Sequence, residues 1–175
     1  DVDLLPTFEA AGIPVAYFEV DDIEDYLRML DICARLTGCP ENYQLYGLQV
    51  KERADRAAAR QDGSAPRVLY VRASGSSVKV KNSQGSVLGE MLADLGCVNV
   101  ADGEGSLLED LSIEGIAAAD PDHIFAVLQG ADKDKAQAAL ERALLSNPAW
   151  SALRAVREGR FHTLDQALYN FKPNA

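Results

Sequence analysis

A polar segment over residues 74–85 holds the side chains best suited to bind a ligand. It combines hydroxyl, amide and cationic groups, and it follows an apolar run over residues 67–73 that is typical of a buried strand. Open α/β sheets bind ligands beyond the carboxyl ends of their strands, so these groups are placed to meet carboxylates or phosphates. The candidate ligand-binding residues here are Arg72, Ser74, Ser76, Ser77, Lys79 and Lys81.

The same segment has a structural interpretation as well. It is then a solvated loop, or a small hairpin in which Val78 and Val80 pack inward. If the segment is extended, Lys79 and Lys81 lie on one face, because alternate side chains point the same way, and the two cations act together. Sequence alone leaves both interpretations open.

A second candidate contact point is the acidic tip of a short helix at Glu114. Ser112 is a typical N-cap, and Glu114 falls in the first turn, where the helix dipole favours negative charge. Pro121 ends the helix before a buried apolar strand over residues 124–128. A helix this short buries little surface and is suited to present its tip. The alternative is an ordinary first-turn glutamate that stabilises its own helix.

Catalytic and metal-binding patterns are missing from the sequence. It has no Ser-His-Asp set, phosphate loop, Cys-x-x-Cys motif or paired carboxylates, so we expect a protein that is not an enzyme. His123 and His162 have no accompanying carboxylate pattern, which is more typical of structural histidines than of metal ligands. We therefore expect no metal site and no intrinsic cofactor.

Composition limits the partners. The chain has 175 residues, of which 47% are hydrophobic, enough for one domain or slightly more. Its net charge of -10 argues against binding to a nucleic-acid backbone. No run approaches the roughly 18 apolar residues that a membrane span requires. The chain opens at Asp1 without a methionine, so we expect a mature product or a piece excised from a longer protein.

The predicted elements are unevenly distributed along the chain. The first part contains a helix over residues 4–11, a strand over 13–18, a helix capped at residue 21 or 22, a long helix over 41–61, and a linker over 62–66. Beyond the linker, strands alternate with helices, which predicts an α/β fold with a mostly parallel sheet covered on both faces. The expected strands there cover residues 67–73, 98–101, 124–128 and 160–164, and the expected helices cover 86–95, 132–145 and 151–157.

Several motifs in this order resemble the substrate-binding proteins of ABC importers for iron-siderophores, haem and cobalamin. The resemblance rests on residues 10–15, 36–38, 41–61, 66–71, 95–100, 112–124 and 147–161. It includes Ser-Ile-Glu at 112–114 followed by Pro-Asp-His-Ile at 121–124, and Pro-Ala-Trp at 148–150 followed by Gly-Arg-Phe at 159–161. Cys97 stands where the family usually has glycine.

The resemblance implies two Rossmann-like lobes joined by a long helix, with the ligand in the cleft between them. Residues 1–20 then correspond to the last helix–strand unit of a truncated first lobe. Residues 21–65 correspond to the connecting helices and linker, and 66–175 to the C-terminal lobe without its final helix. The chain is thus expected to be the remnant of a two-lobed binding protein.

The resemblance also implies a function and its residues. The expected ligand is a metal chelate (a ferric siderophore, haem or a corrinoid), delivered without catalysis to the ABC permease subunits. Glu114 occupies the position of a glutamate that docks on permease arginines. Asn99 and Tyr169 add to the cleft loops, Tyr169 by stacking on a macrocycle together with Phe171, although packing is the more frequent role of such an aromatic pair.

The expected location is extracytoplasmic, in the periplasm or on the cell surface, with membrane contact only through a lipid anchor that this chain has lost. A piece without its first lobe exposes apolar surface, so we also expect self-association. The alternative function is a stand-alone small α/β enzyme or signalling domain with its site in residues 74–85.

Overall fold

The structure is a computed structural model that describes residues 2–20, 22–103, 105–109 and 111–169. The chain divides into two compact units, Asp1–Lys51 and Glu52–Ala175. Within the described residues, no helix combines the length and the apolar character needed to cross a bilayer.

The first unit is helical. A 3-10 turn (η1, Val2–Leu4) leads into α1 (Leu5–Ala10), and α2 (Ile23–Thr37) starts where the Asp22 carboxylate accepts a hydrogen bond from the Asp25 amide at 2.8 Å. A second helical run follows, formed by α3 (Pro40–Asn42), a π-helical segment η2 (Tyr43–Leu48) and α4 (Gln49–Ala58), of which residues 52–58 belong to the second unit. α2 packs on η2, and the phenol of Tyr26 donates to the Tyr46 carbonyl at 2.9 Å.

The prediction of a strand over residues 13–18 is wrong. This segment has no regular secondary structure, and none of the strands of the described sheet pairs with it. A strand requires a neighbour that satisfies its amide and carbonyl groups, and the apolar pattern alone does not provide one. The predicted long helix is continuous but ends at Ala58 rather than at residue 61.

The described part of the second unit is built on one five-stranded sheet: β1 (Arg67–Ala73), β2 (Val78–Lys81), β3 (Val98–Asn99), β4 (His123–Leu128) and β5 (Phe161–Asp165). The strand order is β2-β1-β4-β5, and β3 pairs with the start of β1. Only β2 is antiparallel to its neighbour, so the predicted mostly parallel sheet is confirmed.

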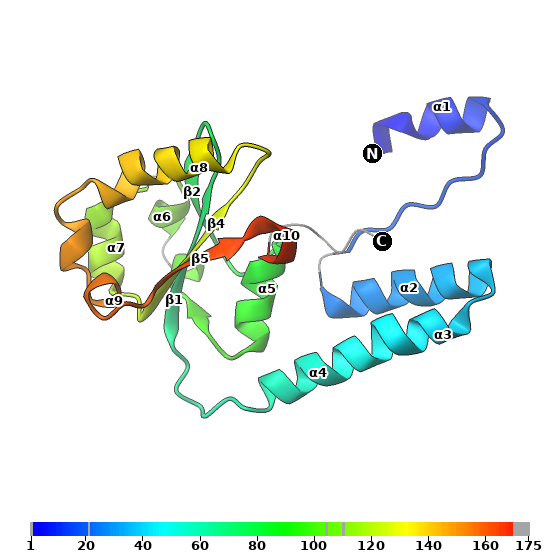
Figure 1. Ribbon diagram of the computed structural model, residues 1–175, viewed down its shortest axis with the longest axis horizontal. Coiled ribbons are helices and arrows are strands. Elements are labelled where there is room, and N and C mark those ends of the chain that lie inside the picture. Colours follow the sequence, from blue (N-terminus) through cyan, green and yellow to red (C-terminus); the bar gives the residue numbers. More distant parts are fainter. Residues whose placement is uncertain (1, 21, 104, 110, 170–175) are drawn as a thin grey trace. The chain divides into compact units, whose positions relative to one another are not determined.

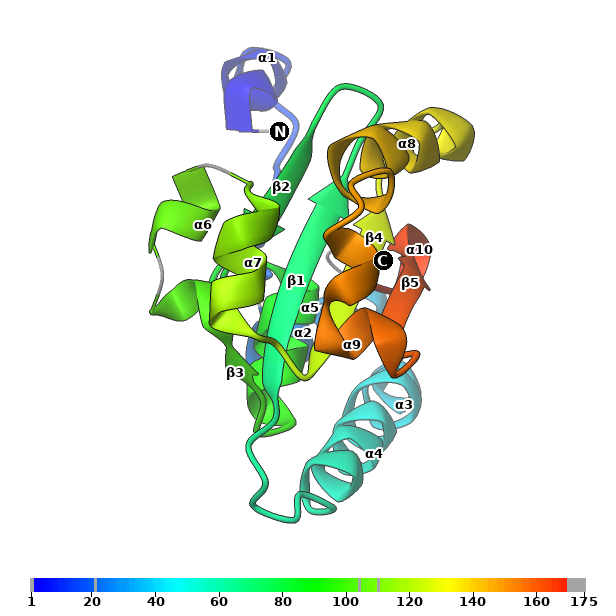
Figure 2. The same cartoon turned by 90° about the vertical axis from the view of Figure 1, so that its left-hand side faces the viewer.

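Helices cover both faces of this sheet, as Figures 1 and 2 show. One face carries α5 (Val87–Asp94) and α10 (Gln166–Tyr169). The other carries α6 (Gly105–Glu109), α7 (Ile113–Ala119), α8 (Lys133–Leu140) and α9 (Arg154–Arg157). Short segments complete the unit: η3 (Val100–Asp102), the π-helical η4 (Glu141–Leu145) and η5 (Trp150–Ala152).

Side chains on the two faces of β1 contribute to two separate hydrophobic clusters. Leu69 and Val71 point into the larger cluster with α6 to α9, where Trp150 meets Phe161 edge-on at 5.2 Å between ring centroids. Val68 and Tyr70 point into the smaller cluster with α5. Sheet strands alternate their side chains between the faces, so this division follows from the period of two in the β1 sequence.

Candidate functional site

The carboxyl ends of three strands meet at one edge of the sheet. Ala73 at the end of β1 is in register with Leu128 of β4, and Leu128 is in register with Asp165 of β5. The segments that follow these strands therefore lie next to one another: the β1–β2 turn, the loop after β4, and α10. We call this set the carboxyl edge.

The segment over residues 74–85 is in part a hairpin. β2 pairs with β1 through Val71–Val80 and Ala73–Val78, and Val80 is buried while Val78 packs on the larger cluster. The hairpin interpretation, with both valines inward, is thereby confirmed. It leaves Lys79 and Lys81 on the opposite face of β2, as expected for an extended segment.

Serine hydroxyls close the hairpin turn. The Ser74 amide donates to the Ser77 carbonyl at 2.7 Å, and the Ser77 amide donates to the Ser74 hydroxyl at 3.2 Å. The two hydroxyl oxygens are 3.2 Å apart. These two candidate binding residues are thus already engaged with each other, whereas Ser76 is exposed at the tip.

Cations gather on the α5 side of the hairpin. Arg72 lies directly across from Lys79, and Tyr70 lies across from Lys81. Burial lowers the pKa of Lys81, and the positive charges of Arg72 and Lys79 lower it further. The three side chains are therefore close enough to act on one another electrostatically.

A buried phenol lies beside these cations. The Tyr70 side chain is 0% exposed, and its hydroxyl has no hydrogen-bond partner among the described residues. Burial raises the pKa of Tyr70 and the charge of Arg72 opposes the rise, so the phenol is a neutral donor near neutral pH. The sequence analysis did not single out Tyr70, and its apolar run is typical of any core strand.

Asn99 fixes the hairpin from within. It is 2% exposed; its amide nitrogen donates to the Lys81 carbonyl at 2.9 Å, and its side-chain oxygen accepts from the Ala101 amide at 3.0 Å. Asp102, in the η3 turn that follows Asn99, accepts a hydrogen bond from the Ser83 amide at 2.8 Å. Asn99 thus serves to hold β2 in place and does not face the solvent.

Tyr169 lies on α10, at the carboxyl edge. It is half-buried and packs on the smaller cluster together with Phe125 and Leu164. Gln166 fixes this short helix through two hydrogen bonds with Gly130, at 2.7 and 2.9 Å. Packing is therefore part of the role of Tyr169. Its expected companion Phe171 lies outside the described residues.

Glu114 is exposed in the first turn of α7, with Ser112 as the N-cap. The Ser112 hydroxyl accepts a hydrogen bond from the Gly115 amide at 2.9 Å, as predicted. No hydrogen bond or ion pair joins the Glu114 carboxylate to another described residue. Because α7 leads back to the start of β4, its first turn points toward the carboxyl edge (Figure 2).

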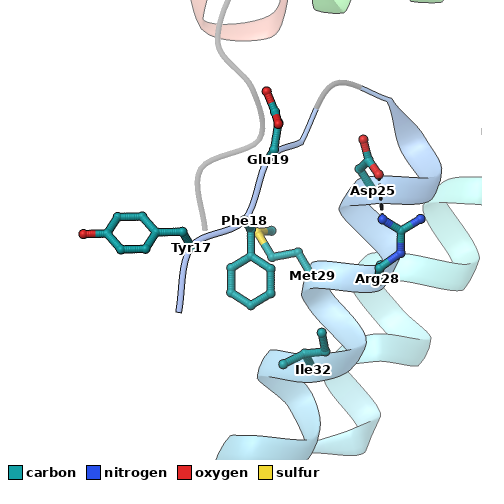
Figure 3. Close-up of a pocket in the computed structure, with 7 residues that line it drawn as sticks. All are labelled: Tyr17, Phe18, Glu19, Asp25, Arg28, Met29 and Ile32. Carbon is teal, nitrogen blue, oxygen red and sulfur yellow. Dashed lines mark hydrogen bonds and ion pairs between the residues drawn. The ribbon is translucent and has the colours of Figure 1, made fainter. Parts of the chain in front are cut away.

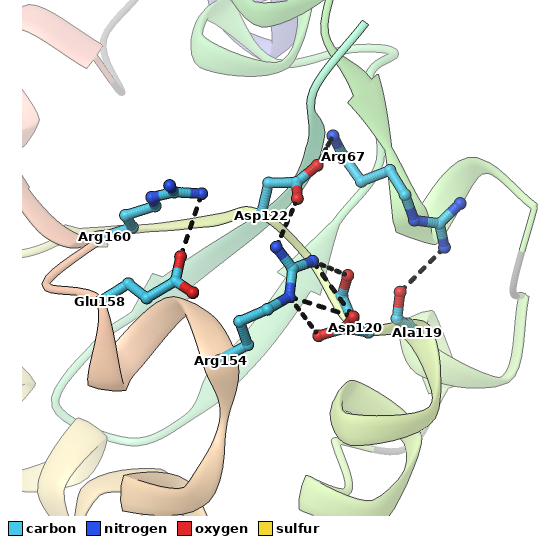
Figure 4. Close-up of polar contacts among 7 residues, drawn as sticks. All are labelled: Arg67, Ala119, Asp120, Asp122, Arg154, Glu158 and Arg160. Carbon is cyan, nitrogen blue, oxygen red and sulfur yellow. Dashed lines mark hydrogen bonds and ion pairs between the residues drawn. The ribbon is translucent and has the colours of Figure 1, made fainter. Parts of the chain in front are cut away.

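The opposite end of α7 is held by two arginines (Figure 4). Arg154 contacts the Asp120 carboxylate at 3.1 Å and the Asp122 carboxylate at 2.8 Å. Arg67 donates to the Ala119 carbonyl at 2.9 Å, and its backbone amide donates to Asp122 at 2.8 Å. Cations at a helix C-terminus satisfy its free carbonyls, so this cluster anchors α7.

We call Arg67, Asp120, Asp122 and Arg154 the α7 anchor. Sequence reasoning missed it, since its members are up to 87 positions apart, and the only local signal is the pair of aspartates around Pro121. Asp120 adopts a left-handed backbone with φ of 39°, which ends the helix at the residue before Pro121.

The first unit contains a pocket of about 480 Å³ between the extended segment and α2 (Figure 3). Tyr17, Phe18 and Glu19 form one wall of the pocket, and Met29 and Ile32 line it from α2. At its rim Arg28 pairs with Asp25 at 2.9 Å. The pocket combines an apolar interior with an ion pair that is already satisfied.

Three rings form a stack on the α5 side of the sheet. His162 lies 5.3 Å from Phe125 and 5.8 Å from His123, measured between ring centroids. Burial lowers the pKa of His123, as do Arg160 and His162, so this imidazole is largely neutral. Among the residues that the structure describes, no three His, Cys, Asp or Glu side chains are grouped to hold a metal ion.

The comparison with protein families decides the class of the chain. A sequence model of the periplasmic binding protein family matches residues 1–168. The chain belongs to the periplasmic binding protein family. A comparison with curated proteins finds no match.

Solved structures similar to this chain cover nearly all of it. An ABC transporter substrate-binding protein from Listeria monocytogenes EGD-e is 18% identical, with a TM-score of 0.73, and the match covers 99% of this chain and 67% of that one. A periplasmic heme binding protein from Pseudomonas aeruginosa is 26% identical, with a TM-score of 0.71 and coverage of 97% and 62%.

The iron-uptake system-binding protein FeuA from Bacillus subtilis is 19% identical, with a TM-score of 0.65 and coverage of 87% and 55%. This chain therefore spans only 55–67% of the length of these three proteins. Its α/β architecture is that of part of a periplasmic binding protein.

Proposed function

We propose that this chain is part of the solute-binding component of an ABC importer. The component captures an iron chelate, haem or a corrinoid and delivers it to the membrane permease without catalysis. The observation that carries the proposal is the family match over residues 1–168. It is supported by similar structures described as a heme binding protein and an iron-uptake system-binding protein.

The ligand would bind at the carboxyl edge of the second unit. Arg72 and Lys79 offer charge beside this edge, and Lys81 adds charge two residues further along β2. Ser76 offers a hydroxyl at the hairpin tip, and Tyr169 offers an aromatic ring. Asn99 would act indirectly, because its amide holds the Lys81 backbone. Open α/β sheets bind ligands at this edge because loops from several strands converge there.

Glu114 would dock on the permease. The exposed carboxylate has no competing partner among the described residues, and it sits on a helix whose other end is held by the α7 anchor. A fixed carboxylate can receive a guanidinium through two parallel hydrogen bonds, which sets orientation as well as attraction. Its position on the side of the carboxyl edge would bring the permease to the ligand.

The location would be extracytoplasmic, as in the rest of the family, with a lipid anchor in the full-length protein. The rival proposal is a small enzyme or signalling domain with its site in residues 74–85. The family consists of substrate-binding proteins and not of enzymes. The hairpin serines also bond to each other and not to a catalytic base.

Ligand capture tests this function. The purified chain would be titrated with hemin, ferric citrate and cyanocobalamin, each followed by its absorption band, next to the full-length protein. We expect saturable binding of one of the three, stronger in the full-length protein because its cleft has two walls. Failure of both proteins to bind any metal chelate would contradict the proposal.

A further inference from the structure

The α5 side of the β1–β2 hairpin carries three cations in one cluster. Residues directly opposite in an antiparallel pair point to the same face, so Arg72 shares a face with Lys79. Lys81 lies two residues further along the same face of β2. Burial lowers its pKa, and the positive charges of Arg72 and Lys79 both lower it further. Val78 and Val80 occupy the other face of β2 and pack in the core. This packing fixes which face of the hairpin carries the three cations.

Nothing in the described chain neutralises the two lysines. Neither Lys79 nor Lys81 forms an ion pair with a described residue, whereas Lys133 and Lys135 on α8 each pair with an aspartate. The whole chain carries a net charge of -10, so acidic partners were abundant in the sequence. Clustered like charges repel one another, and a bound anion removes that repulsion.

The backbone that carries this cluster is held in place. Asn99 fixes the Lys81 backbone from inside the protein, and Ser74 and Ser77 close the turn at the other end of the hairpin. The buried Tyr70 hydroxyl next to Arg72 remains without a hydrogen-bond acceptor among the described residues. A fixed backbone keeps the three cations on one face of the hairpin and loses little conformational entropy when a ligand binds.

We propose that Arg72, Lys79 and Lys81 form an anion site that takes the carboxylate groups of the transported ligand. This inference rests on the proposed function and narrows it to an acidic chelate, such as a carboxylate-bearing tetrapyrrole or a carboxylate siderophore complex. A corrinoid, whose side chains are mostly uncharged amides, does not fit three cations. Arginine and lysine recognise carboxylates through charge-assisted hydrogen bonds.

The test uses citrate, an iron-free tricarboxylate, as a probe of the anion site. Binding of citrate to the chain would be measured by calorimetry at low salt, and binding of hemin and hemin dimethyl ester by absorbance. We expect citrate and hemin to bind at least tenfold more weakly to Lys79→Gln/Lys81→Gln, and hemin dimethyl ester to bind weakly to both proteins. Lys79→Arg/Lys81→Arg should retain binding because it keeps both charges.

The matched control is Arg142→Gln/Arg157→Gln, which removes two exposed cations from helices on the other face of the sheet. Equal citrate affinity in the wild type, the lysine variant and this control would overturn the anion site, even if hemin binds. Citrate binding that depends on the lysines, with no binding of any metal chelate, would support the anion site and contradict the proposed importer function instead. Circular dichroism would verify that each variant folds.

Discussion

Arg154 binds Asp122 across the start of β4, with 2.8 Å between its Nη1 atom and the carboxylate. The same guanidinium reaches Asp120, so one side chain of α9 holds both residues that flank Pro121 (Figure 4). The hydrogen bonds that Arg154 donates to the carboxylates of Asp120 and Asp122 raise the pKa of Arg154, which therefore stays charged at every accessible pH. This contact connects α9 to the end of α7, the helix that presents Glu114.

Replacing Arg154 tests this anchor. We expect Arg154→Met to lower the melting temperature by several degrees, because the carbonyl of Asp120 and two carboxylates lose their donor. The melting temperature of Arg154→Lys should lie between those of the wild type and Arg154→Met, since a lysine keeps the charge but cannot reproduce the forked geometry. Thermal unfolding followed by Trp150 fluorescence measures the change. Arg157→Met on the same helix is the control, and an equal loss in both variants would contradict the anchor.

The α7 anchor also predicts a pH dependence. The hydrogen bond that the Arg67 amide donates, followed by the one from Arg154, lowers the pKa of Asp122 below the ordinary value for an aspartate. A group with a lowered pKa in the folded state stabilises the protein above its unfolded pKa. That stability is lost as the pH falls through the folded value. We therefore expect the free energy of unfolding of Asp122→Asn to decrease less than that of the wild type below about pH 4.

Urea denaturation at several pH values between neutrality and strong acid would measure this effect. The wild-type free energy of unfolding should fall more steeply below about pH 4 than that of Asp122→Asn. Asp134→Asn, on the exposed first turn of α8, is the matched control. Parallel curves for the wild type and Asp122→Asn would show that Asp122 does not contribute.

The substitution Glu114→Arg should impair delivery of the ligand to the permease and leave ligand binding unchanged. In the full-length protein we expect transport to fall at least tenfold, since a cation placed against permease arginines replaces attraction with repulsion. The affinity for the ligand should stay within twofold of the wild type, because the side chain is exposed and unconnected to the hairpin. Uptake of labelled ligand and direct titration measure the two quantities.

Glu109→Arg, on the exposed end of α6, makes the same change of charge nearby and serves as the control. Normal transport by Glu114→Arg would remove Glu114 from the docking surface. Equal loss in both variants would indicate a general charge effect on association rather than one docking point.

The first unit is expected to self-associate. Its extended segment exposes Ile13, Val15, Tyr17 and Phe18, with 38–51% of each side chain open to solvent, and forms no strand pair with the described chain. Exposed apolar residues on an extended segment outside any described sheet favour association with another chain. We expect the chain to show oligomers in light scattering, and Ile13→Lys/Val15→Lys to reduce their fraction severalfold. A monodisperse wild-type monomer would contradict this prediction.

Local patterns predicted much of the second unit. The apolar runs that became β1 and β4 specify their strands, and Ser112 and Gly38 mark a helix start and a helix end through capping chemistry that depends only on neighbours. The two lysines of β2 were placed on one face by the period of an extended chain alone. These features follow from sequence because their causes act within a few residues.

Other features depended on contacts between distant residues. The apolar pattern of residues 13–18 suggested a strand, but a strand exists only when another segment pairs with it. The α7 anchor joins Arg67, Asp122 and Arg154, and no local signal links residues so far apart. The sequence determined most helices and strands of the second unit and the side chains that they offer. Only the tertiary structure decided that Arg72, Lys79 and Lys81 meet beside a buried phenol, because strand register sets that proximity.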